Sequence, residues 1–196
     1  MPHLILIRHS LVSREAIGPN SDWPLSTEGR DLCTALAEAL CPYAPQVVVS
    51  SEMRRARETA ELTATHLDIP WRTAAGLEEH HRPFVPGGRR AEADFAATMR
   101  RFFASPADRV FGEETASEAH DRFAAAIDVI LAAEPGRHVA IVTHGTVLAL
   151  YAAPFFNLPP LDLWQRIAWP SFIVIDPTAA VGLHLQETVQ RRSCRP

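Results

Sequence analysis

Short runs of consecutive apolar residues divide the chain. Runs of this kind, without polar alternation, are typical of strands that are covered on both faces, as in parallel sheets. They lie at residues 4–7, 47–49, 139–142, 172–175 and 181–185. A further short strand is predicted around Trp71, and a turn near residues 176–177 is predicted to join the last two runs.

Between these runs, apolar residues recur every three or four positions, which predicts amphipathic helices. The predicted helices follow Ser26, Ser50–Ser51 and Thr115, and two more cover residues 91–104 and 146–151. Ser26 and the pair Ser50–Ser51 are interpreted as N-caps, and Thr115 with Glu118 matches a capping box. Buried strands that alternate with helices predict an α/β fold, a three-layer α/β/α sandwich around a mostly parallel central sheet.

Length and composition fit an ordinary globular domain. The chain has 196 residues, of which 47% are hydrophobic and 21% are charged, enough to bury a sizeable core. We predict a single domain over residues 1–190, followed by a flexible tail at 191–196. The net charge of −4 lacks the basic excess of nucleic-acid-binding proteins, so no nucleic-acid partner is expected. No apolar stretch approaches the length of a membrane span, so no membrane partner is expected either.

The cysteines and the N-terminal segment bear on the cellular compartment. Cys33, Cys41 and Cys194 suit neither a disulfide framework nor a metal site with paired ligands. The apolar run at 4–7 is too short, and too soon followed by charge, for a signal peptide. We therefore expect a protein of the reducing cytoplasm. The oligomeric state is left open by the sequence, and a homodimer is one option.

Residues that can hold an anion follow three of the predicted strands. Arg8 and His9 end the first strand, Arg55 follows the second after a short polar segment, and His144 ends the strand over 139–142. Binding sites of open parallel sheets gather at the carboxyl ends of strands, so these side chains converge if the three strands are parallel neighbours. Helix N-termini at the same edge add positive dipole ends. Two histidines and two arginines there predict a phosphate pocket.

Six motifs along the chain carry a resemblance to a known family. They are LIRHS at 6–10, DWPLSTEG at 22–29, SSEMRRARETA at 50–60, LEE at 77–79, GEETASEAHDR at 112–122 and VTHG at 142–145. In this order they resemble the L-x-R-H-G, D-x-P-L-T-x-x-G, S-S-x-x-x-R-A-x-x-T-A, L-x-E, G-E-S…R and V-x-H-G motifs of the histidine phosphatase superfamily, also called phosphoglycerate mutase-like. Each motif alone is weak evidence, but the set in family order is strong evidence. The resemblance implies a phosphoglycerate mutase-like fold and a phosphoryl-transfer enzyme.

The resemblance also implies a role for each candidate residue. His9 takes the phosphoryl group and forms a phosphohistidine, while Arg8, Arg55 and His144 bind the phosphoryl oxygens. Glu79 is implied as the proton donor to the leaving oxygen. Chemistry agrees, since neutral imidazole is a competent nucleophile and fixed cations stabilise a transferring phosphoryl group. Because arginines supply the positive charge, we expect no metal ion and no cofactor.

The chain departs from the family pattern just after the predicted nucleophile. Ser10, Val12 and Glu15 stand where the family usually has Gly, Thr and Asn. Ser13 is a candidate to offer the substrate a hydroxyl in place of the missing Thr. These departures weaken the resemblance to the mutases of the family.

A second departure follows Glu79, where many members carry G-x-W-E-G and this chain has HHRPF at 80–84. Glu78 therefore stays an alternative to Glu79 as the proton donor. His80 and His81 are adjacent and would rarely bind one metal ion, so we interpret His81 as a candidate substrate contact. The segment 80–112 is expected to cover the crevice and to select the substrate.

Four further residues have plain structural interpretations. Glu114 and Arg122 are interpreted as a helix-start charge and as an outward or bridging arginine. Trp164 and Trp169, which lie near prolines, are interpreted as packing residues.

Three functions fit these observations. The first is a metal-independent phosphatase that hydrolyses a small phosphorylated substrate, a phosphomonoester. The second is a phosphomutase acting on a phosphoglycerate, although such enzymes usually carry longer insertions that shield the phosphohistidine. The third is a non-catalytic module that binds a phosphorylated ligand, which the retention of all four pocket residues opposes. The natural phosphate ester is left open.

Overall fold

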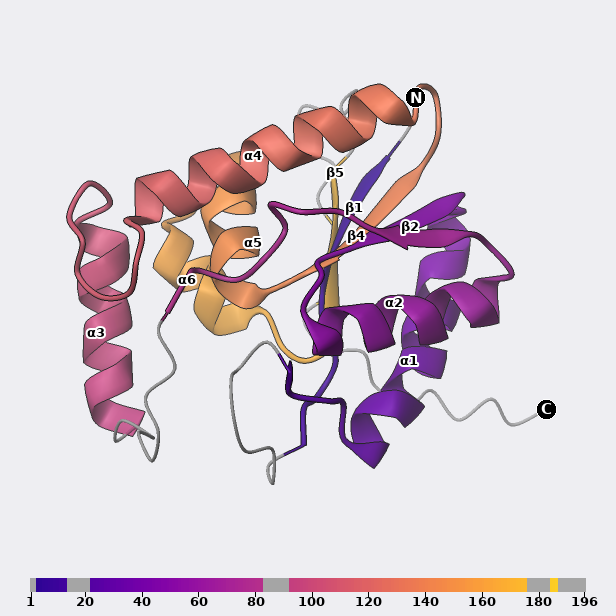
Figure 1. Cartoon of the computed structure of the whole chain (residues 1–196), viewed down its shortest axis with the longest axis horizontal. Helices are drawn as coiled ribbons and strands as arrows, with labels where there is room; N and C mark the ends of the chain where they lie inside the picture. The colour runs from indigo at the N-terminus through magenta and orange to yellow at the C-terminus, as the bar shows by residue number, and fades with distance from the viewer. Residues whose placement is uncertain (1–2, 14–21, 83–91, 176–183, 187–196) are drawn as a thin grey trace.

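The computed structural model describes residues 3–13, 22–82, 92–175 and 184–186 (Figure 1). A six-stranded sheet has the order β3-β2-β4-β1-β5-β6. The first four strands in this order are parallel, and β5 and β6 are antiparallel to their neighbours. The strands are β1 (Leu4–Arg8), β2 (Val47–Ser50), β3 (Trp71–Thr73), β4 (Val139–Thr143), β5 (Ser171–Ile175) and β6 (His184–Gln186). The predicted mostly parallel sheet is confirmed.

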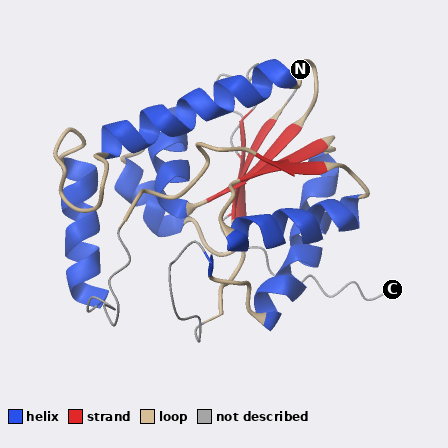
Figure 2. Cartoon of the chain, in the orientation of Figure 1, coloured by secondary structure: helices blue, strands red, loops and turns tan. Residues whose placement is uncertain are grey.

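Helices cover both faces of the sheet (Figure 2). The helices are α1 (Thr27–Leu40), α2 (Arg54–Leu67), α3 (Glu92–Ala104), α4 (Ala116–Ala133), α5 (Gly145–Ala152) and α6 (Pro160–Arg166), with the short 3₁₀ helices η2 (Cys41–Tyr43) and η3 (Ala153–Phe156). Along β1, Ile5 and Ile7 belong to the core shared with α1 and α2. Leu4 and Leu6 face the other way, into the core shared with α4, α5 and α6. Alternation along one strand thus feeds two cores, and the three-layer α/β/α sandwich is confirmed.

Helix starts follow the predicted caps at two places and differ at a third. Ser26 Oγ accepts the Gly29 N–H of α1 at 3.0 Å, and Thr115 with Glu118 forms the capping box of α4. The N-cap assignment of Ser50–Ser51 is wrong, because α2 begins only at Arg54, after Met53, without a side-chain cap. Both serines belong to the edge of the sheet instead. Ser50 is the last residue of β2, and the Ser51 N–H donates to the Val142 carbonyl of β4 at 3.0 Å.

The segment predicted to cover the crevice also contributes to the core. Met99 and Phe102 of α3 are fully buried. Trp164 of α6 packs against Phe95 and Phe103, with ring centres 6.2 and 6.1 Å apart, as the packing interpretation expects. The residues 176–183, the tail at 191–196 and Glu15 lie outside the described residues. Within the described part of the chain, no helix combines the length and the apolar character that crossing a membrane requires.

Candidate active site

The carboxyl ends of three parallel strands meet at one edge of the sheet. β4 lies between β1 and β2, with Arg8 paired to Thr143 and Ser50 paired to Val142. His9 and His144 follow β1 and β4 directly, and their ring centres lie 5.2 Å apart. The structure therefore brings together the residues that the sequence placed at one crevice.

His9 is held with one ring nitrogen free of its proton. Nδ1 lies 2.8 Å from the Ser10 carbonyl oxygen, which accepts only from a protonated nitrogen, so the proton is assigned to Nδ1. Nε2 then carries the lone pair, and Arg55 Nε donates to it at 3.0 Å. Burial, aided by the charges of Arg55 and Arg8, holds the pKa of His9 well below its usual value. The ring is therefore neutral near pH 7, with its lone pair on Nε2.

Arg8 is fixed by contacts from distant segments. Its Nη1 donates to the Ile167 carbonyl, and the Trp169 ring stacks on the guanidinium, with its centre 3.6 Å from Cζ. A Cβ at Gly145 would lie 2.9 Å from Arg8 Cζ, so glycine leaves room for the guanidinium there. Burial lowers the pKa of Arg8 to about 10, which leaves it cationic at neutral pH. Trp169 is 45% exposed, so it covers Arg8 at the surface and is not a core residue.

His144 is completely buried and is oriented by Ser51. Its Nε2 lies 2.9 Å from Ser51 Oγ, and its Nδ1 has no hydrogen-bond partner among the described residues. Burial is the largest cause that holds the pKa of His144 well below its usual value, followed by the charge of Arg55. Sequence reasoning missed the role of Ser51, although the S-S motif was the available signal.

Glu79 lies against the N-terminus of α5. The Thr146 N–H donates to both carboxylate oxygens at 3.2 Å, and the His80 N–H donates to Oε1 at 3.0 Å. Burial raises the pKa of Glu79, but Arg82, the two N–H donors and Arg55 outweigh it and keep the pKa below its usual value. Glu79 is therefore ionised at neutral pH.

Glu78, the alternative proton donor, has a different environment. Its Oε2 accepts the Gly76 N–H at 2.8 Å and lies 3.7 Å from Arg122 Nη1. Of the two carboxylates, Glu79 is the one held against α5.

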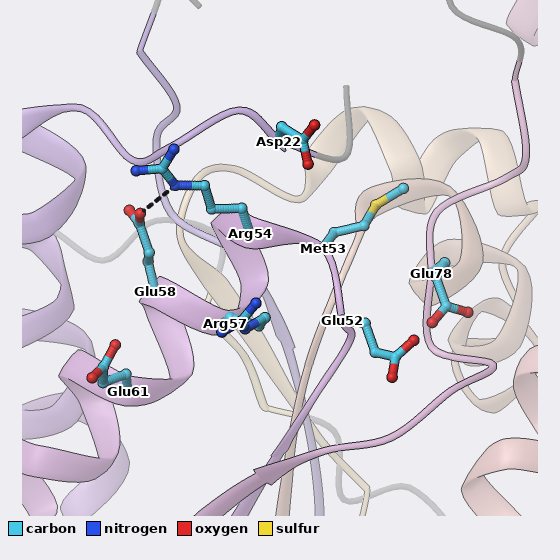
Figure 3. Close-up of a pocket in the computed structure, with 8 residues that line it drawn as sticks. All are labelled: Asp22, Glu52, Met53, Arg54, Arg57, Glu58, Glu61 and Glu78. Atoms are coloured by element: carbon cyan, nitrogen blue, oxygen red, sulfur yellow. Dashed lines mark hydrogen bonds and ion pairs between the residues drawn. The ribbon is translucent and has the colours of Figure 1, made fainter. Parts of the chain in front are cut away.

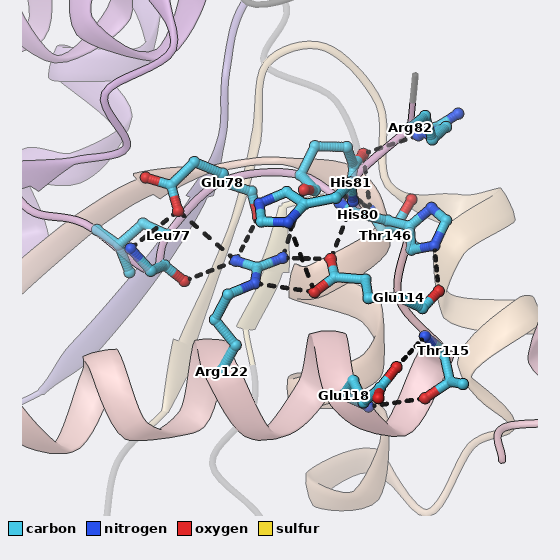
Figure 4. Close-up of polar contacts among 12 residues, drawn as sticks. Leu77, Glu78, His80, His81, Arg82, Glu114, Thr115, Glu118, Arg122 and Thr146 are labelled. Atoms are coloured by element: carbon cyan, nitrogen blue, oxygen red, sulfur yellow. Dashed lines mark hydrogen bonds and ion pairs between the residues drawn. The ribbon is translucent and has the colours of Figure 1, made fainter. Parts of the chain in front are cut away.

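Arg122 ties the loop that carries Glu79 to helix α4 (Figure 4). Its Nη1 donates to the carbonyl oxygens of Gly76 and Glu78 at 2.9 and 3.1 Å. Its Nη2 and Nε donate to the two oxygens of Glu114, at 2.6 and 3.1 Å. Arg122 was predicted to be either an outward or a bridging arginine, and it is the bridging one. Glu114 is buried and holds Arg122 in place, so it is more than a helix-start charge.

The two histidines after Glu79 have separate environments. His80 is buried between Phe102 and Phe111, with ring centres 4.5 and 4.7 Å away, and its Nε2 lies 2.8 Å from the Glu114 carbonyl oxygen. His81 donates its backbone N–H to Glu114 Oε1 at 2.9 Å, and its half-exposed ring lies 3.9 Å from Oε2. A contact of His81 with substrate stays a prediction.

Arg82 is a site residue that the sequence reasoning did not single out. Its Nη2 lies 3.6 Å from Glu79 Oε2, and its guanidinium lies 5.5 Å from the ring centres of both Phe95 and Phe111. Burial, Arg55, His9 and Arg8 lower the pKa of His144 more strongly, and the charge of Arg82 adds a smaller lowering. The signal was available in the sequence, since Arg82 lies where the usual G-x-W-E-G stretch is replaced.

Ser10 and Ser13, two serines that closely follow His9, have local hydrogen-bond partners. Ser10 Oγ donates to the Gly29 carbonyl at 2.7 Å, and the Ser10 N–H donates to Thr59 Oγ at 3.0 Å. The Ser13 N–H donates to the Pro24 carbonyl at 2.9 Å. A role of Ser13 toward substrate stays a prediction.

A cavity of about 510 Å³ lies beside the start of α2 (Figure 3). It is lined by Asp22, Glu52, Met53, Arg54, Arg57, Glu58, Glu61 and Glu78. Figure 3 shows Glu78 facing this space from the loop that carries Glu79. Because the lining includes none of Arg8, His9, Arg55 and His144, the cavity is not the predicted phosphate pocket.

Comparison with known proteins gives concordant matches. The model of the histidine phosphatase superfamily (branch 1) matches residues 4–180. A Mycolicibacterium vanbaalenii protein named glucosyl-3-phosphoglycerate phosphatase is 29% identical over 173 residues, which cover 82% of this chain and 76% of that protein. The Mycobacterium tuberculosis protein of the same name is 28% identical over 190 residues, which cover 86% and 78%. A solved mycobacterial glucosyl-3-phosphoglycerate phosphatase in complex with inorganic phosphate has a TM-score of 0.70 at 25% identity and covers 95% of this chain and 96% of that one.

Proposed function

Because the family match spans most of the chain, the protein belongs to the histidine phosphatase superfamily (branch 1) and is a phosphatase, and we propose that it hydrolyses a phosphomonoester through a phosphohistidine on His9. The observation that supports this proposal best is the hydrogen bond between His9 Nδ1 and the Ser10 carbonyl oxygen. This bond holds the proton on Nδ1 and leaves Nε2 as the nucleophile.

In the first step, His9 Nε2 forms a bond to phosphorus while the bond from phosphorus to the leaving oxygen breaks. Arg8, Arg55 and His144 Nδ1 stabilise the charge on the three phosphoryl oxygens in this proposal, which the closeness of the two histidine rings, the Arg55 contact with His9 and the Nδ1 of His144, unpaired among the described residues, support. Glu79 gives a proton to the leaving oxygen. Because Glu79 is ionised at neutral pH, this proton enters with the monoanionic form of the ester.

In the second step, water hydrolyses the phosphohistidine. The Glu79 carboxylate takes a proton from water as the water oxygen attacks phosphorus, and the bond from Nε2 to phosphorus breaks. Inorganic phosphate leaves with the proton that Glu79 took from water, and Glu79 and His9 return to their starting forms. The step uses protein groups and water, so the proposed reaction needs no metal ion and no cofactor.

The substrate proposal starts from the relatives. The curated relatives are named for glucosyl-3-phosphoglycerate, and we propose a small phosphorylated substrate of this kind as the first to test. Ser13, His81 and the segment 80–112 are the proposed contacts beyond the phosphate. We further propose a cytoplasmic single domain over residues 1–190, with homodimerisation to be decided by measurement.

The proposal is tested by phosphate release from a panel of esters that includes glucosyl-3-phosphoglycerate and p-nitrophenyl phosphate, with a chelator present. The intact protein should release phosphate, and His9→Ala should lose about 10⁴-fold or more of the rate. His66→Ala, a change at an exposed histidine of α2, is the matched control and should retain activity. Full activity of His9→Ala would contradict the mechanism, and isomerisation of 3-phosphoglycerate without phosphate release would favour a mutase.

A further inference from the structure

Arg82 has a position that phosphate binding alone does not explain. We propose that Arg82 binds a carboxylate on the leaving group of the substrate, close to the ester oxygen. This inference rests on the proposed function, because it takes Glu79 as the group that faces the leaving oxygen. Arg82 Nη2 lies 3.6 Å from Glu79 Oε2. A substrate group attached near the leaving oxygen, which Glu79 faces in the proposal, is therefore within reach of the guanidinium.

The guanidinium of Arg82 is held in place yet accessible. Phe95 of α3 and Phe111 lie under it, each with a ring centre 5.5 Å from Cζ. Its Nε is buried without a hydrogen-bond partner among the described residues, while the side chain as a whole is 25% exposed. Aromatic support on a partly desolvated arginine strengthens an ion pair and limits the geometries in which it forms.

The proposed site carries one positive charge more than the phosphoryl group and a protonated Glu79 can offset. Arg8, Arg55 and Arg82 are arginines and therefore cationic, and Glu79 is the carboxylate that pairs with Arg82 among the described residues. A phosphoryl dianion offsets two of the three positive charges, and Glu79 offsets the third only while it is ionised. When Glu79 carries the proton for the leaving oxygen, Arg82 is left without a counter-charge. A partly buried charge without a partner is costly, and a carboxylate of the substrate removes that cost.

The chemistry of the guanidinium favours a carboxylate over other groups. Its planar fork matches the two oxygens of a carboxylate, and one negative charge is the amount required. Binding of such a group would draw Arg82 from Glu79 and thereby favour the protonated form of Glu79. Arg82 would thus couple recognition of an acidic leaving group to the acid step.

A matched pair of esters tests the inference. 3-Phosphoglycerate and glycerol 3-phosphate differ in whether the leaving group ends in a carboxylate or in a neutral alcohol. The ratio of their kcat/KM values cancels effects common to both esters. For the intact protein we expect kcat/KM to be about 10 to 100 times higher for 3-phosphoglycerate than for glycerol 3-phosphate, as for a hydrogen bond to a charged group. In Arg82→Met and Arg82→Gln the ratio should fall to about 1, and in Arg82→Lys, which keeps the charge and loses the fork, it should lie between.

Arg137→Met removes a positive charge at the opposite end of β4 and should keep the ratio of the intact protein. A ratio near 1 for the intact protein, or an unchanged ratio in both Arg82→Met and Arg82→Gln, would overturn the inference. The proposed function is tested separately, by turnover of p-nitrophenyl phosphate in the intact protein and its loss in His9→Ala. These two results can be obtained while the Arg82 inference fails, so the two failures are distinguishable.

Discussion

The two halves of the proposed active site are built in different ways. The phosphate half consists of Arg8, which ends β1, and of His9, Arg55 and His144, which follow β1, β2 and β4, and all four are almost fully buried. The leaving-group half consists of Glu79 and Arg82 on a loop that follows β3, held by side chains of other elements. The phosphate half takes its geometry from the sheet, whereas the leaving-group half depends on the Glu114–Arg122 pair.

This difference suggests a division of tasks. A phosphoryl group is the same in every phosphomonoester, so its pocket can be rigid and can rest on strands. The leaving group varies among substrates, and a loop held by side chains can change without altering the sheet. Substitutions in the phosphate half should therefore affect all esters alike, while substitutions in the leaving-group half should discriminate between esters.

The largest discrimination is expected for Glu79→Gln. Loss of the proton donor should slow alkyl phosphate esters about 10²- to 10⁴-fold, because an alkoxide leaves poorly without a proton. p-Nitrophenyl phosphate should be slowed far less, since nitrophenolate needs no proton. The measurement is kcat/KM for both esters, which reports on the first step and not on hydrolysis of the phosphohistidine, with Glu78→Gln as the control that should discriminate little. Equal slowing of both esters by Glu79→Gln would remove it as the acid.

The phosphate half should show the opposite pattern in Arg55→Met. Arg55 Nε contacts the nucleophilic Nε2 of His9, so its loss should lower kcat about 10²- to 10³-fold. The two esters should be affected to the same extent, because the arginine acts on the phosphoryl group that they share. Arg72→Met, at the edge strand β3, removes a charge paired with Glu134 and should leave kcat near that of the intact protein. Strong ester dependence in Arg55→Met would contradict the division into halves.

A smaller effect is expected when the anchor of the loop is weakened. Glu114→Gln removes the negative partner of Arg122, so the loop should hold Glu79 less well. We expect about a 10-fold loss of kcat/KM on alkyl esters, a smaller loss on p-nitrophenyl phosphate, and a free energy of unfolding lower by about 1–3 kcal/mol. If kcat/KM falls equally for both esters, Glu114 does not act through the position of the proton donor.

The smallest effect concerns the dependence of stability on pH. His9 and His144 have pKa values well below the ordinary 6.5, so only the unfolded chain gains protons on these residues as the pH falls just below 6.5. The folded state should lose at most about 1.4 kcal/mol per pH unit for each of the two residues. Thermal unfolding between about pH 7.5 and 5 would show this, and His144→Gln should reduce the loss. A fall as steep in His144→Gln as in the intact protein would exclude His144 as a cause.

The sequence predicted the phosphate half well because that half follows from strand order. Apolar runs at 4–7, 47–49 and 139–142 mark buried strands, and the polar residues that follow parallel neighbours must meet at one edge. The nitrogen that carries the proton of His9 could not be predicted, because the acceptor is a backbone carbonyl whose direction depends on the turn after β1. The roles of these residues in catalysis stay proposals.

The leaving-group half was less predictable because its contacts join residues far apart in the chain. Arg122 lies more than forty residues from the loop that it anchors, and its partners there are carbonyl oxygens, which every residue has. Arg82 gave no periodic signal, since its place is set by two phenylalanines and by Glu79. Serine commonly caps helices, so the sequence predicts a cap at Ser51, yet the Ser51 hydroxyl contacts His144.

The most direct test of the central claim is to trap the covalent intermediate. The protein is mixed with an ester carrying labelled phosphate, quenched within one turnover in alkali, where phosphohistidine survives, and digested for mass spectrometry. We predict one phosphoryl group per chain, on His9, with the label absent in His9→Ala and accumulating in Glu79→Gln when the leaving group is nitrophenolate. Phosphate release with no labelled protein at any time, or a label on another residue, would contradict the account.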